Sequence, residues 1–265
     1  MKLLRPSARK SYSPPAFLDD RVGYAIGDVH GRLDLLVELL TVLEARLSDE
    51  MRESGPPIAV FLGDYVDRGP QSAGVIDLVL DGAPRGYERR FLMGNHEQSM
   101  LAFMEAPLQS RPWVLQGGAE TLLSYGVQPP ATVAASEDDW IAVAEALRAK
   151  LPAAHHDFLR GLERYVALGG FAFVHAGVDH ARTLEQQTDD DLFWSRERFL
   201  ASKKRFSHVV VHGHTPAERP YLDERRIGLD TGAYASGVLT AARFEGTDVS
   251  FLSVSDSGGR RSVVG

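Results

Sequence analysis

Three segments of the chain repeat the same order of apolar strand, tight turn and helix. Short apolar runs at 22–26, 58–62 and 89–93 have the length and composition of buried strands. A turn and a helical pattern follow each of them, with helices predicted near 71–81 and from about 96. In the first helix the apolar spacing is carried by Leu33, Leu36, Leu39, Leu40 and Leu43. Strands that alternate with helices indicate an α/β domain.

The pattern changes twice after the third unit. From about 105 to 165 the chain is mostly helical and polar, with breaks at "QGG", "YGVQPP" and Pro152. We predict an insertion of helices here rather than an independent domain. The following half is rich in strand patterns and begins with a hairpin that turns at Gly169-Gly170. Its later strand candidates are "HVVVHGHTP", "RIGLDTGAY", "GVLTAARFEG" and "DVSFLSV".

The two ends of the chain lack such patterns. The first residues are basic, with serines and prolines, and contain no continuous apolar run of the kind that a signal peptide needs. No later segment has the length of a transmembrane helix. We therefore expect a flexible leader at 1–18, a single domain over 19–255 and a loose tail at 256–265.

Composition narrows the class of protein further. The chain has 265 residues and a net charge of −7, so a nucleic-acid scaffold is not expected, because phosphate backbones select basic surfaces. It contains no cysteine, which excludes disulfides, thiolate zinc sites and a cysteine nucleophile. This composition is compatible with a reducing cytosol, and we predict a cytoplasmic protein with no membrane partner.

Polar residues lie directly after five of the predicted strands: Asp28, His30, Asp64, Asn95, His175 and His214. Taken singly, each is a common turn-capping residue. In open α/β sheets, however, ligands bind at the carboxyl ends of the strands, so these turns can converge on one place. Carboxylate, imidazole and amide ligands without sulfur suit Mn²⁺, Fe²⁺, Co²⁺, Zn²⁺ or Mg²⁺. The set predicts two ions, one on Asp28 and His30 and one on Asn95, His175 and His214, with Asp64 bridging them.

The motifs around these residues resemble a known family. "GDVHG", "GDYVDRG", "GNHE", "HAG" and "GHT", in this order, are similar to the metallophosphoesterases of the phosphoprotein phosphatase (PPP) family. The bacterial branch, which also contains symmetrical diadenosine tetraphosphate hydrolases, is the more similar one. The motifs span residues 24 to 216, with further similarity through "DTGAYASGVLTA". The resemblance implies a four-layer α/β/β/α sandwich with a dinuclear metal centre.

The resemblance also implies roles for individual residues. It supports the same six metal ligands, and Asn95 is expected to help bind the substrate phosphate as well. His96 matches the general acid, Asp67 its partner and Arg68 a phosphate clamp. The alternative for Asp67 and Arg68 is a local salt bridge without a catalytic role.

Charge explains how such a site would work. Two ions about 3.5–4 Å apart clamp the phosphate and lower the pKa of a bridging water, so that hydroxide attacks phosphorus directly. Arg68 would stabilise the charge on the phosphate oxygens through a bidentate pair. His96 would protonate the leaving alkoxide while Asp67 orients its imidazole. We expect Mn²⁺, with Fe, Zn, Co or Mg as alternatives.

Two segments near the end of the motif series leave alternatives open. In "HGHTP", Pro216 occupies the place where a GHxH pattern would have its second histidine, so we predict His214 as ligand and His212 as its support. In "DLFWSRERFL", Arg196 matches a second phosphate-binding arginine, although the segment also fits an amphipathic surface helix. Trp194 and Arg196 would face the site together only on an extended segment.

Other residues receive simpler interpretations. Asp230 either supports a ligating histidine or forms a turn. Four histidines are expected on the surface or in the core rather than on metal: His155, His156, His180 and His208. Three residues are expected to pack a helix into the core: Met100, Phe103 and Met104.

The function predicted from the sequence is a metal-dependent phosphomonoesterase acting on phosphoserine or phosphothreonine in proteins. The alternative is a symmetrical dinucleoside polyphosphate hydrolase, and the partner is then a small phosphorylated substrate. The insertion either caps the site or shapes a peptide groove, and three of its aromatic residues are candidates for stacking on adenine: Trp113, Tyr125 and Trp140. A non-catalytic metal-binding module is disfavoured, because binding alone needs no general acid.

Overall fold

Two β-sheets stacked face to face form the centre of the computed structural model, which describes residues 15–130, 132, 135–256 and 261–263. The first sheet has six strands in the order β11-β10-β9-β1-β2-β3 and the second has five in the order β4-β5-β6-β8-β7. The strands of the first sheet are β1 (Val22–Ile26), β2 (Ile58–Phe61), β3 (Glu88–Phe91), β9 (Val238–Glu245), β10 (Asp248–Ser255) and β11 (Arg261–Val263). Those of the second are β4 (Val166–Leu168), β5 (Phe171–Phe173), β6 (Val209–His212), β7 (Tyr221–Leu222) and β8 (Arg226–Gly228).

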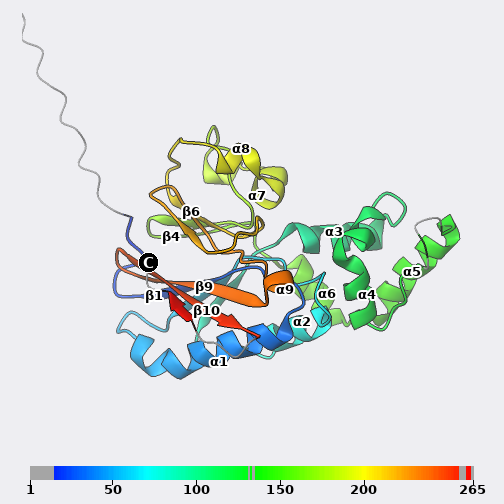
Figure 1. Cartoon of the computed structure of the whole chain (residues 1–265), viewed down its shortest axis with the longest axis horizontal. Helices are drawn as coiled ribbons and strands as arrows, with labels where there is room; N and C mark the ends of the chain where they lie inside the picture. Colours follow the sequence, from blue (N-terminus) through cyan, green and yellow to red (C-terminus); the bar gives the residue numbers. More distant parts are fainter. Residues whose placement is uncertain (1–14, 131, 133–134, 257–260, 264–265) are drawn as a thin grey trace, which may run out of the picture.

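Helices cover the outer face of each sheet. The helices are α1 (Leu33–Glu50), α2 (Ser72–Leu80), α3 (Asn95–Glu105), α4 (Ala119–Ser124), α5 (Glu137–Lys150), α6 (Ala153–Arg160), α7 (Asp189–Trp194), α8 (Glu197–Leu200) and α9 (Ala233–Ser236), with a π-helical turn η1 (Val114–Gly118) and a 3-10 turn η2 (Leu184–Gln186). Figure 1 shows α1 and α2 below the first sheet and α7 and α8 above the second. This confirms the predicted four-layer α/β/β/α sandwich.

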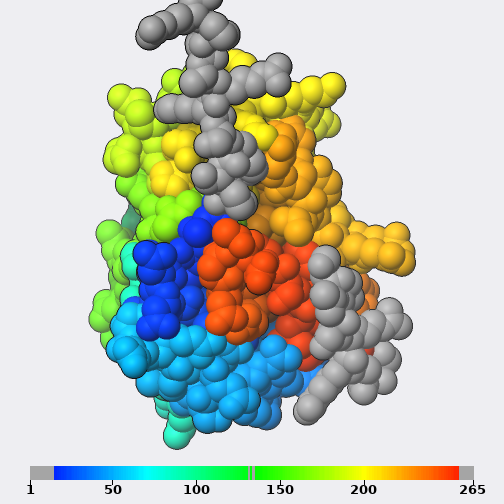
Figure 2. All heavy atoms as spheres, turned by 90° about the vertical axis from the view of Figure 1, so that its left-hand side faces the viewer, coloured from blue at the N-terminus to red at the C-terminus, as the bar shows by residue number. Residues whose placement is uncertain are grey.

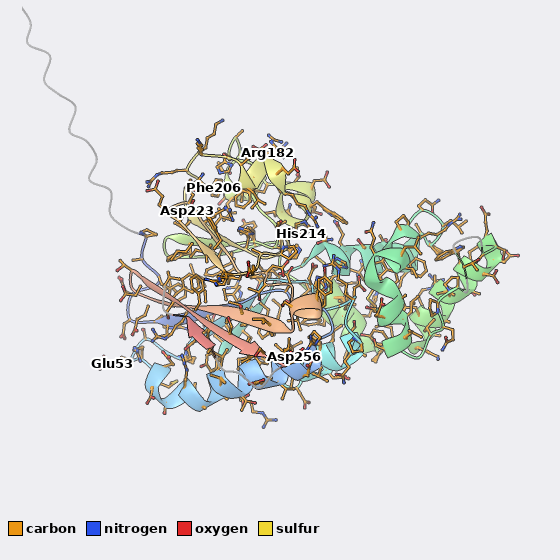
Figure 3. All side chains as sticks on the ribbon, in the orientation of Figure 1. Glu53, Arg182, Phe206, His214, Asp223 and Asp256 are labelled. Atoms are coloured by element: carbon orange, nitrogen blue, oxygen red, sulfur yellow. The ribbon has the colours of Figure 1, made fainter. Side chains whose placement is uncertain are left out.

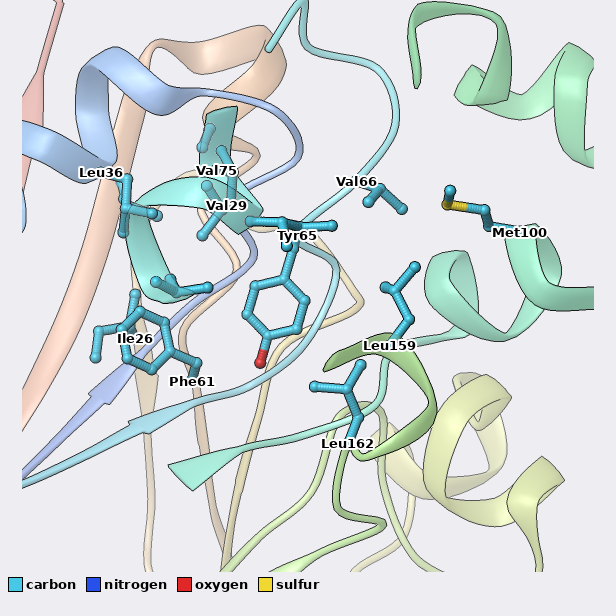
Figure 4. Packing of buried hydrophobic residues seen from close by; sticks show 14 of the residues in the cluster. Ile26, Val29, Leu36, Phe61, Tyr65, Val66, Val75, Met100, Leu159 and Leu162 are labelled. Carbon is cyan, nitrogen blue, oxygen red and sulfur yellow. The ribbon is translucent and has the colours of Figure 1, made fainter. Parts of the chain in front are cut away.

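Side chains along each central strand alternate between two hydrophobic cores, one on each face of the first sheet. In β1 the side chains of Tyr24 and Ile26 point into the core between the first sheet and α1, whereas Ala25 points into the core between the sheets. In β2, Phe61 and Val60 divide in the same way. Successive strand residues face opposite sides of a sheet, so a strand buried on both faces is apolar throughout. Figure 4 shows part of the core beneath the first sheet, where Ile26, Phe61 and Tyr65 pack together.

The carboxyl ends of the central strands face one end of the sandwich. Strands β1, β2 and β3 are parallel to one another, as are β5, β6 and β8. Helices α3 to α6 lie beyond that end in Figure 1. The opposite end is seen in Figure 2, with α1 along the bottom and segments of the second sheet above. The loops after the parallel strands therefore meet on the side of the insertion.

The insertion packs on the first core rather than standing apart. Buried residues of the 105–165 segment, such as Trp140 and Leu159, belong to the same hydrophobic cluster as the side chains of α1 and β2. Met100, Phe103 and Met104 of α3 are also buried there, as predicted. The insertion is thus attached to the sandwich through a shared core.

The two ends of the chain differ from the expectation. The predicted leader is described only from residue 15, and Phe17 is buried, stacks on Phe244 and donates its N–H to the carbonyl of Gly246 at 2.7 Å. The tail was expected to be loose, but β11 adds to the edge of the first sheet, antiparallel to β10. Residues 1–14, 257–260 and 264–265 lie outside the described residues. No helix in the described part of the chain is long and apolar enough to cross a membrane.

Candidate functional site

The loops that follow the parallel strands form the site, and several of their residues have an unusual backbone. His30, Asp64, Asp67, Arg68 and His214 all have φ between 46° and 75°, although none is glycine. Such left-handed conformations cost free energy and gather at functional sites, where the surrounding structure holds them. The loops also interlock, because the carbonyl of Asp64 accepts the backbone N–H of His30 at 2.8 Å. His214 lies at the end of the second sheet that is turned toward the insertion (Figure 3).

Among the described residues, two clusters have ligand atoms close enough to hold a metal ion. The first consists of His30, Asp64 and His96, and all three are buried. His30 Nε2 lies 3.4 Å from Asp64 Oδ2, and His96 Nε2 lies 4.0 Å from the same oxygen. His30 Nδ1 lies 2.9 Å from the carbonyl of Val66. A carbonyl can only accept, so Nδ1 carries the proton and Nε2 presents a lone pair to Asp64.

The second cluster consists of Asp64, His175 and His214. The Nδ1 of His175 donates to the carbonyl of Leu62 at 2.8 Å, which leaves a lone pair on Nε2. That nitrogen faces Asp64 Oδ1 at 3.4 Å and Asn95 Oδ1 at 2.9 Å. His214 Nδ1 approaches the same Asn95 oxygen at 2.8 Å. His175 Nε2 and the oxygens of Asp64 and Asn95 are acceptor atoms that point at one another in a buried site, which is the arrangement a cation stabilises.

Asp28 gives a further test of whether the residues fit divalent ions. Its Oδ2 accepts the backbone N–H of His214 at 2.8 Å, but its Oδ1 is buried without a hydrogen-bond partner within the described residues. Burial, together with the carboxylates of Asp230 and Asp64, raises the pKa of Asp28 well above its usual value. A buried carboxylate oxygen is stabilised by a bound cation, so the donor set fits divalent metal ions.

His96 and Asp67 form the predicted pair. His96 Nδ1 lies 2.6 Å from Asp67 Oδ2, and the Asp67 side chain is fully buried. Burial alone would lower the pKa of His96, but the carboxylates of Asp64 and Asp67 raise it above its usual value. With Nδ1 bonded to Asp67, the Nε2 atom points toward Asp64; it accepts from Arg68 in the neutral imidazole and carries a proton for a group bound there only in the charged form.

Two arginines reach the same space. Arg68 donates through Nη1 to His30 Nε2 and through Nη2 to His96 Nε2, both at 3.1 Å. Its guanidinium lies over the ring of Tyr234, 4.6 Å from the centroid. Arg196 donates through Nε to His214 Nε2 at 2.9 Å. Positive groups thus approach the site from both sheets.

The segment that carries Arg196 is neither of the two forms considered from the sequence. Helix α7 ends at Trp194 and α8 begins at Glu197, with φ −132° and ψ −107° at Arg196 between them. The break turns Arg196 inward, while Trp194 remains 40 % exposed and donates its indole N–H to Gln98 at 2.7 Å. A continuous surface helix would have pointed Arg196 away.

Other residues considered from the sequence are in neither of the two clusters found in the described residues. The His212 ring contacts the carbonyl of the next residue, Gly213, and the guanidinium of Arg226. His212 belongs to neither cluster found in the described residues. Asp230 accepts the N–H of Gly232 at 2.8 Å, which is a turn contact, and burial raises its pKa to about 6. The four remaining histidines do not join the clusters either: His155, His156, His180 and His208.

The three aromatic candidates for adenine stacking are buried, which excludes that role. Trp113, Tyr125 and Trp140 are 3 %, 9 % and 1 % exposed. Tyr234, which lies under the guanidinium of Arg68, is an exposed aromatic residue at the site instead. Burial of these side chains depends on which helix faces pack together, and the sequence pattern alone does not define that packing.

Sequence reasoning gave Glu97 no role, yet its side chain is fully buried beside Asp64. Its carboxylate accepts backbone N–H groups from Asp64, Tyr65, Val66 and Gly94 at 2.7–3.2 Å. Burial and the neighbouring Asp64 raise the pKa of Glu97 to about 8. The sequence did contain a signal for Glu97, its position in "GNHE". A carboxylate next to predicted metal ligands needs hydrogen-bond donors or a cation if it is buried.

Comparison with known proteins agrees with this geometry. The calcineurin-like phosphoesterase family profile matches residues 24–236, which is most of the chain. The asymmetrical bis(5'-nucleosyl)-tetraphosphatase PrpE of Geobacillus thermodenitrificans is 29% identical over 236 residues, covering 83% of this chain and 89% of that protein. The symmetrical bis(5'-nucleosyl)-tetraphosphatase of Vibrio cholerae is 26% identical over 267 residues, covering 84% and 94%.

Other relatives carry different names. Serine/threonine-protein phosphatase 1 of Salmonella typhimurium is 27% identical over 231 residues, covering 84% of this chain and 91% of that protein. Among solved structures, a cold-active protein tyrosine phosphatase has a TM-score of 0.61 at 17% identity, covering 98% of this chain and 87% of that chain, which supports the fold. The family is dinuclear and metal-dependent, in agreement with the two clusters around Asp64. The chain belongs to the calcineurin-like phosphoesterases, and it is a hydrolase of phosphoric esters.

Proposed function

We propose that this chain hydrolyses dinucleoside polyphosphates of the diadenosine tetraphosphate type. Relatives with this activity in their names, of both the symmetrical and the asymmetrical kind, cover most of the chain. This reverses the order of the two functions predicted from the sequence, where phosphoserine and phosphothreonine came first.

The observation that carries the proposal is the exposed aromatic ring of Tyr234 beside Arg68, with a second exposed ring, that of Trp194, close to Arg196 in the sequence. Tyr234 is 38 % exposed, lies under the guanidinium of Arg68 and packs edge-on against His30 at 5.3 Å. Trp194 is 40 % exposed and lies two residues before Arg196. Exposed aromatic rings are platforms for nucleobases, while guanidinium groups bind phosphate. A dinucleotide has both matching groups, a base that would stack on Tyr234 and a phosphate chain that would bind the guanidinium groups.

We assign the metal ligands as the sequence predicted them. Asp28, His30 and Asp64 would hold one divalent ion, and Asp64, Asn95, His175 and His214 the other; Mn²⁺ is the ion we expect. Bound ions supply Lewis-acid stabilisation of the phosphoryl oxygens and lower the pKa of water.

The residues of the chain supply the remaining steps. Arg68, Arg196 and the Asn95 amide bind phosphoryl oxygens and hold the phosphorus in line with a water molecule. The water oxygen forms a bond to phosphorus as the bond to the leaving oxygen breaks. His96 Nε2 transfers its proton to that leaving oxygen, and Asp67 stabilises the imidazole through Nδ1.

The test is a direct comparison of substrates. Purified protein with Mn²⁺ is assayed on diadenosine tetraphosphate and on a phosphoserine peptide, and the nucleotide products are separated. We expect a higher kcat/KM for the dinucleotide. Two molecules of ADP would show symmetrical cleavage, and ATP with AMP asymmetrical cleavage. A higher kcat/KM for the phosphopeptide would overturn the proposal.

The aromatic platforms have their own control. Tyr234→Ala and Trp194→Ala should raise KM for diadenosine tetraphosphate and leave KM for p-nitrophenyl phosphate unchanged, because the small substrate has no base to stack. Equal changes for both substrates would contradict base stacking.

The second candidate function is a phosphoprotein phosphatase. It is favoured by the Salmonella relative named serine/threonine-protein phosphatase 1. The same assay decides between the two, since a protein phosphatase would act on the peptide and gain nothing from the aromatic pair.

A further inference from the structure

The turn that carries the acid pair and the first arginine has a costly backbone. Asp67 and Arg68 have φ of 75° and 68°, so two consecutive non-glycine residues lie in the left-handed region. Such a pair persists only where surrounding contacts hold it. The source of those contacts therefore bears on how the acid and the arginine are aimed.

Three groups of the insertion make these contacts. The indole N–H of Trp113 donates to Asp67 Oδ2 at 2.7 Å, and the hydroxyl of Thr121 donates to Asp67 Oδ1 at 2.6 Å. The carbonyl of Gly117 accepts the backbone N–H of Arg68 at 3.0 Å. We call Trp113, Gly117 and Thr121 the clasp. It holds Asp67 through its side chain and its backbone N–H, which donates to Thr121 Oγ1 at 2.8 Å, and it holds Arg68 through its backbone N–H.

Two glycines between Trp113 and Thr121 allow the backbone of the insertion to come close to Arg68 and to the Trp113 ring. Gly117 has φ 118°, and a Cβ there would lie 2.6 Å from Arg68 Cγ and 3.0 Å from the Arg68 nitrogen. A Cβ on Gly118 would lie 2.5 Å from the Trp113 ring. This accounts for the "QGG" sequence, since a larger residue at 117 would collide with Arg68 and one at 118 would collide with the Trp113 ring.

The clasp and the imidazole share one carboxylate. Asp67 Oδ2 accepts from His96 Nδ1 at 2.6 Å and from Trp113 at 2.7 Å, while Oδ1 is taken by Thr121. The two insertion donors fix the rotation of the carboxylate, and the carboxylate in turn fixes the plane of the His96 ring. Without them Asp67 could rotate, and the His96 Nε2 would lose its direction toward Asp64.

We propose that Trp113 and Thr121 are positioning residues for the His96–Asp67 pair, so that the helical insertion is a working part of the site rather than a cover over it. The inference rests on the proposed role of His96 as general acid, and it does not depend on which phosphorylated substrate is used. Neither residue touches substrate. Both act through Asp67.

The chain offers a matched control for Trp113. Trp140 lies in the same insertion, is 1 % exposed and packs against Phe103, as Trp113 does. Its indole N–H has no hydrogen-bond partner within the described residues. Replacing Trp140 by phenylalanine removes ring volume alone, whereas the same change at Trp113 also removes the hydrogen bond to Asp67.

The experiment compares leaving groups. Trp113→Phe and Trp140→Phe are assayed with Mn²⁺ on an alkyl phosphate and on p-nitrophenyl phosphate, whose leaving group departs without a proton. General acids contribute about 10²–10⁴-fold, and we expect Trp113→Phe to lose roughly tenfold or more in kcat on the alkyl phosphate. The loss on p-nitrophenyl phosphate and the change in KM should be small. Trp140→Phe should keep both kcat values. Equal losses on both substrates, or the same loss in the control, would reduce Trp113 to a packing residue.

Thr121 supplies a second, smaller change. Thr121→Val removes the hydroxyl at nearly constant volume and should give the same selective loss, and Thr121→Ser should restore activity. In a His96→Asn background, Trp113→Phe should cause no further loss on the alkyl phosphate, because the two residues act as one unit. A further loss there would contradict the inference. If His96→Asn itself showed no dependence on the leaving group, the acid role would fail first, and the two failures are thus distinguishable.

A spectroscopic readout needs no turnover. In ¹⁵N-labelled protein the indole resonance of Trp113, identified by its loss in Trp113→Phe, should move in Asp67→Asn, and that of Trp140 should not. The Nδ1 proton of His96 should shift in Trp113→Phe. Unmoved resonances would show that the clasp does not control Asp67, whatever the activity of the enzyme.

Discussion

The two halves of the turn from Asp64 to Arg68 are held from different sides. The first half, from Asp64 to Val66, donates its backbone N–H groups to Glu97 at the start of α3. The second half, Asp67 and Arg68, is held by the clasp of the insertion. Five consecutive residues therefore depend on two separate regions of the chain.

The difference separates two chemical tasks. The half that Glu97 holds contains Asp64, which lies in both metal clusters. The half that the clasp holds contains Asp67, the proposed partner of the acid, and Arg68, which we propose binds phosphate. Metal binding and proton transfer should then respond to different substitutions, although the residues concerned are adjacent in sequence. The predictions below test this separation, from the largest effect to the smallest.

The first prediction removes the residue common to both clusters. Asp64→Asn should abolish tight binding of both ions, because one carboxylate oxygen faces each cluster. Loss of metal stabilisation worth several kcal/mol corresponds to a fall in kcat/KM of about 10³-fold or more. Metal analysis and circular dichroism on the purified variant check this. Two tightly bound ions in a folded Asp64→Asn protein would refute the bridging role.

The second prediction uses an arginine that neither Glu97 nor the clasp contacts. Arg196→Ala should cost about 2–4 kcal/mol of transition-state binding, by analogy with losing one donor to a developing oxyanion. Arg196→Lys should rescue it only in part, because an ammonium group cannot reproduce the planar fork. Metal content should stay the same. An unchanged kcat/KM in Arg196→Ala would exclude Arg196 from phosphate binding.

The ligand half of this comparison was predictable from the sequence, and the clasp half was not. Strand endings and residue types pointed to Asp64 and His175, which lie in one cluster, because polar turns at the carboxyl ends of parallel strands meet at the same edge of a sheet in any strand order. The family resemblance added the layer order of the fold. Trp113, in contrast, was only a candidate for stacking on adenine, because the sequence of a helical insertion does not indicate which partner the N–H of an indole will meet.

Short elements account for the other errors. The tail forms β11, and residues near Phe17 pack on the sheet, because a few residues can pair through their backbone or fill one gap without any periodic pattern. Arg196 reaches the site because the chain breaks between two short helices. The spacing of apolar residues cannot reveal a break of only two residues. Local geometry of this kind follows from tertiary packing, not from propensity.

The third prediction affects the metal side alone. Glu97→Gln keeps one acceptor oxygen but replaces the other by an amide that cannot accept, so at least one buried N–H of the turn loses its partner. Substitution of a residue that hydrogen-bonds to a metal ligand and orients it typically lowers metal affinity by about 10–100-fold. We expect a lower affinity for Mn²⁺ in that range and an unchanged ratio of rates on the alkyl phosphate and p-nitrophenyl phosphate. A selective loss on the alkyl phosphate would mean that the two halves of the turn are coupled.

The last prediction asks whether the insertion matters to catalysis only through the clasp. Tyr125, at the end of α4, donates its hydroxyl to His155 Nδ1 at 2.9 Å, and His155 Nε2 lies 2.9 Å from Asp77 on α2. This chain of bonds ties insertion helices to the sandwich without touching Asp67 or Arg68. Tyr125→Phe leaves a buried nitrogen without its donor, which should lower the free energy of unfolding by about 1–3 kcal/mol.

Activity should not follow that loss of stability. Below the melting temperature kcat and KM of Tyr125→Phe should match the parent on both substrates, because the clasp keeps its three contacts. Thermal unfolding and initial rates on the same preparation measure the two effects together. A selective fall of kcat on the alkyl phosphate in Tyr125→Phe would show that loosening any part of the insertion disturbs His96. Trp113 and Thr121 would then have no specific role in positioning the His96–Asp67 pair.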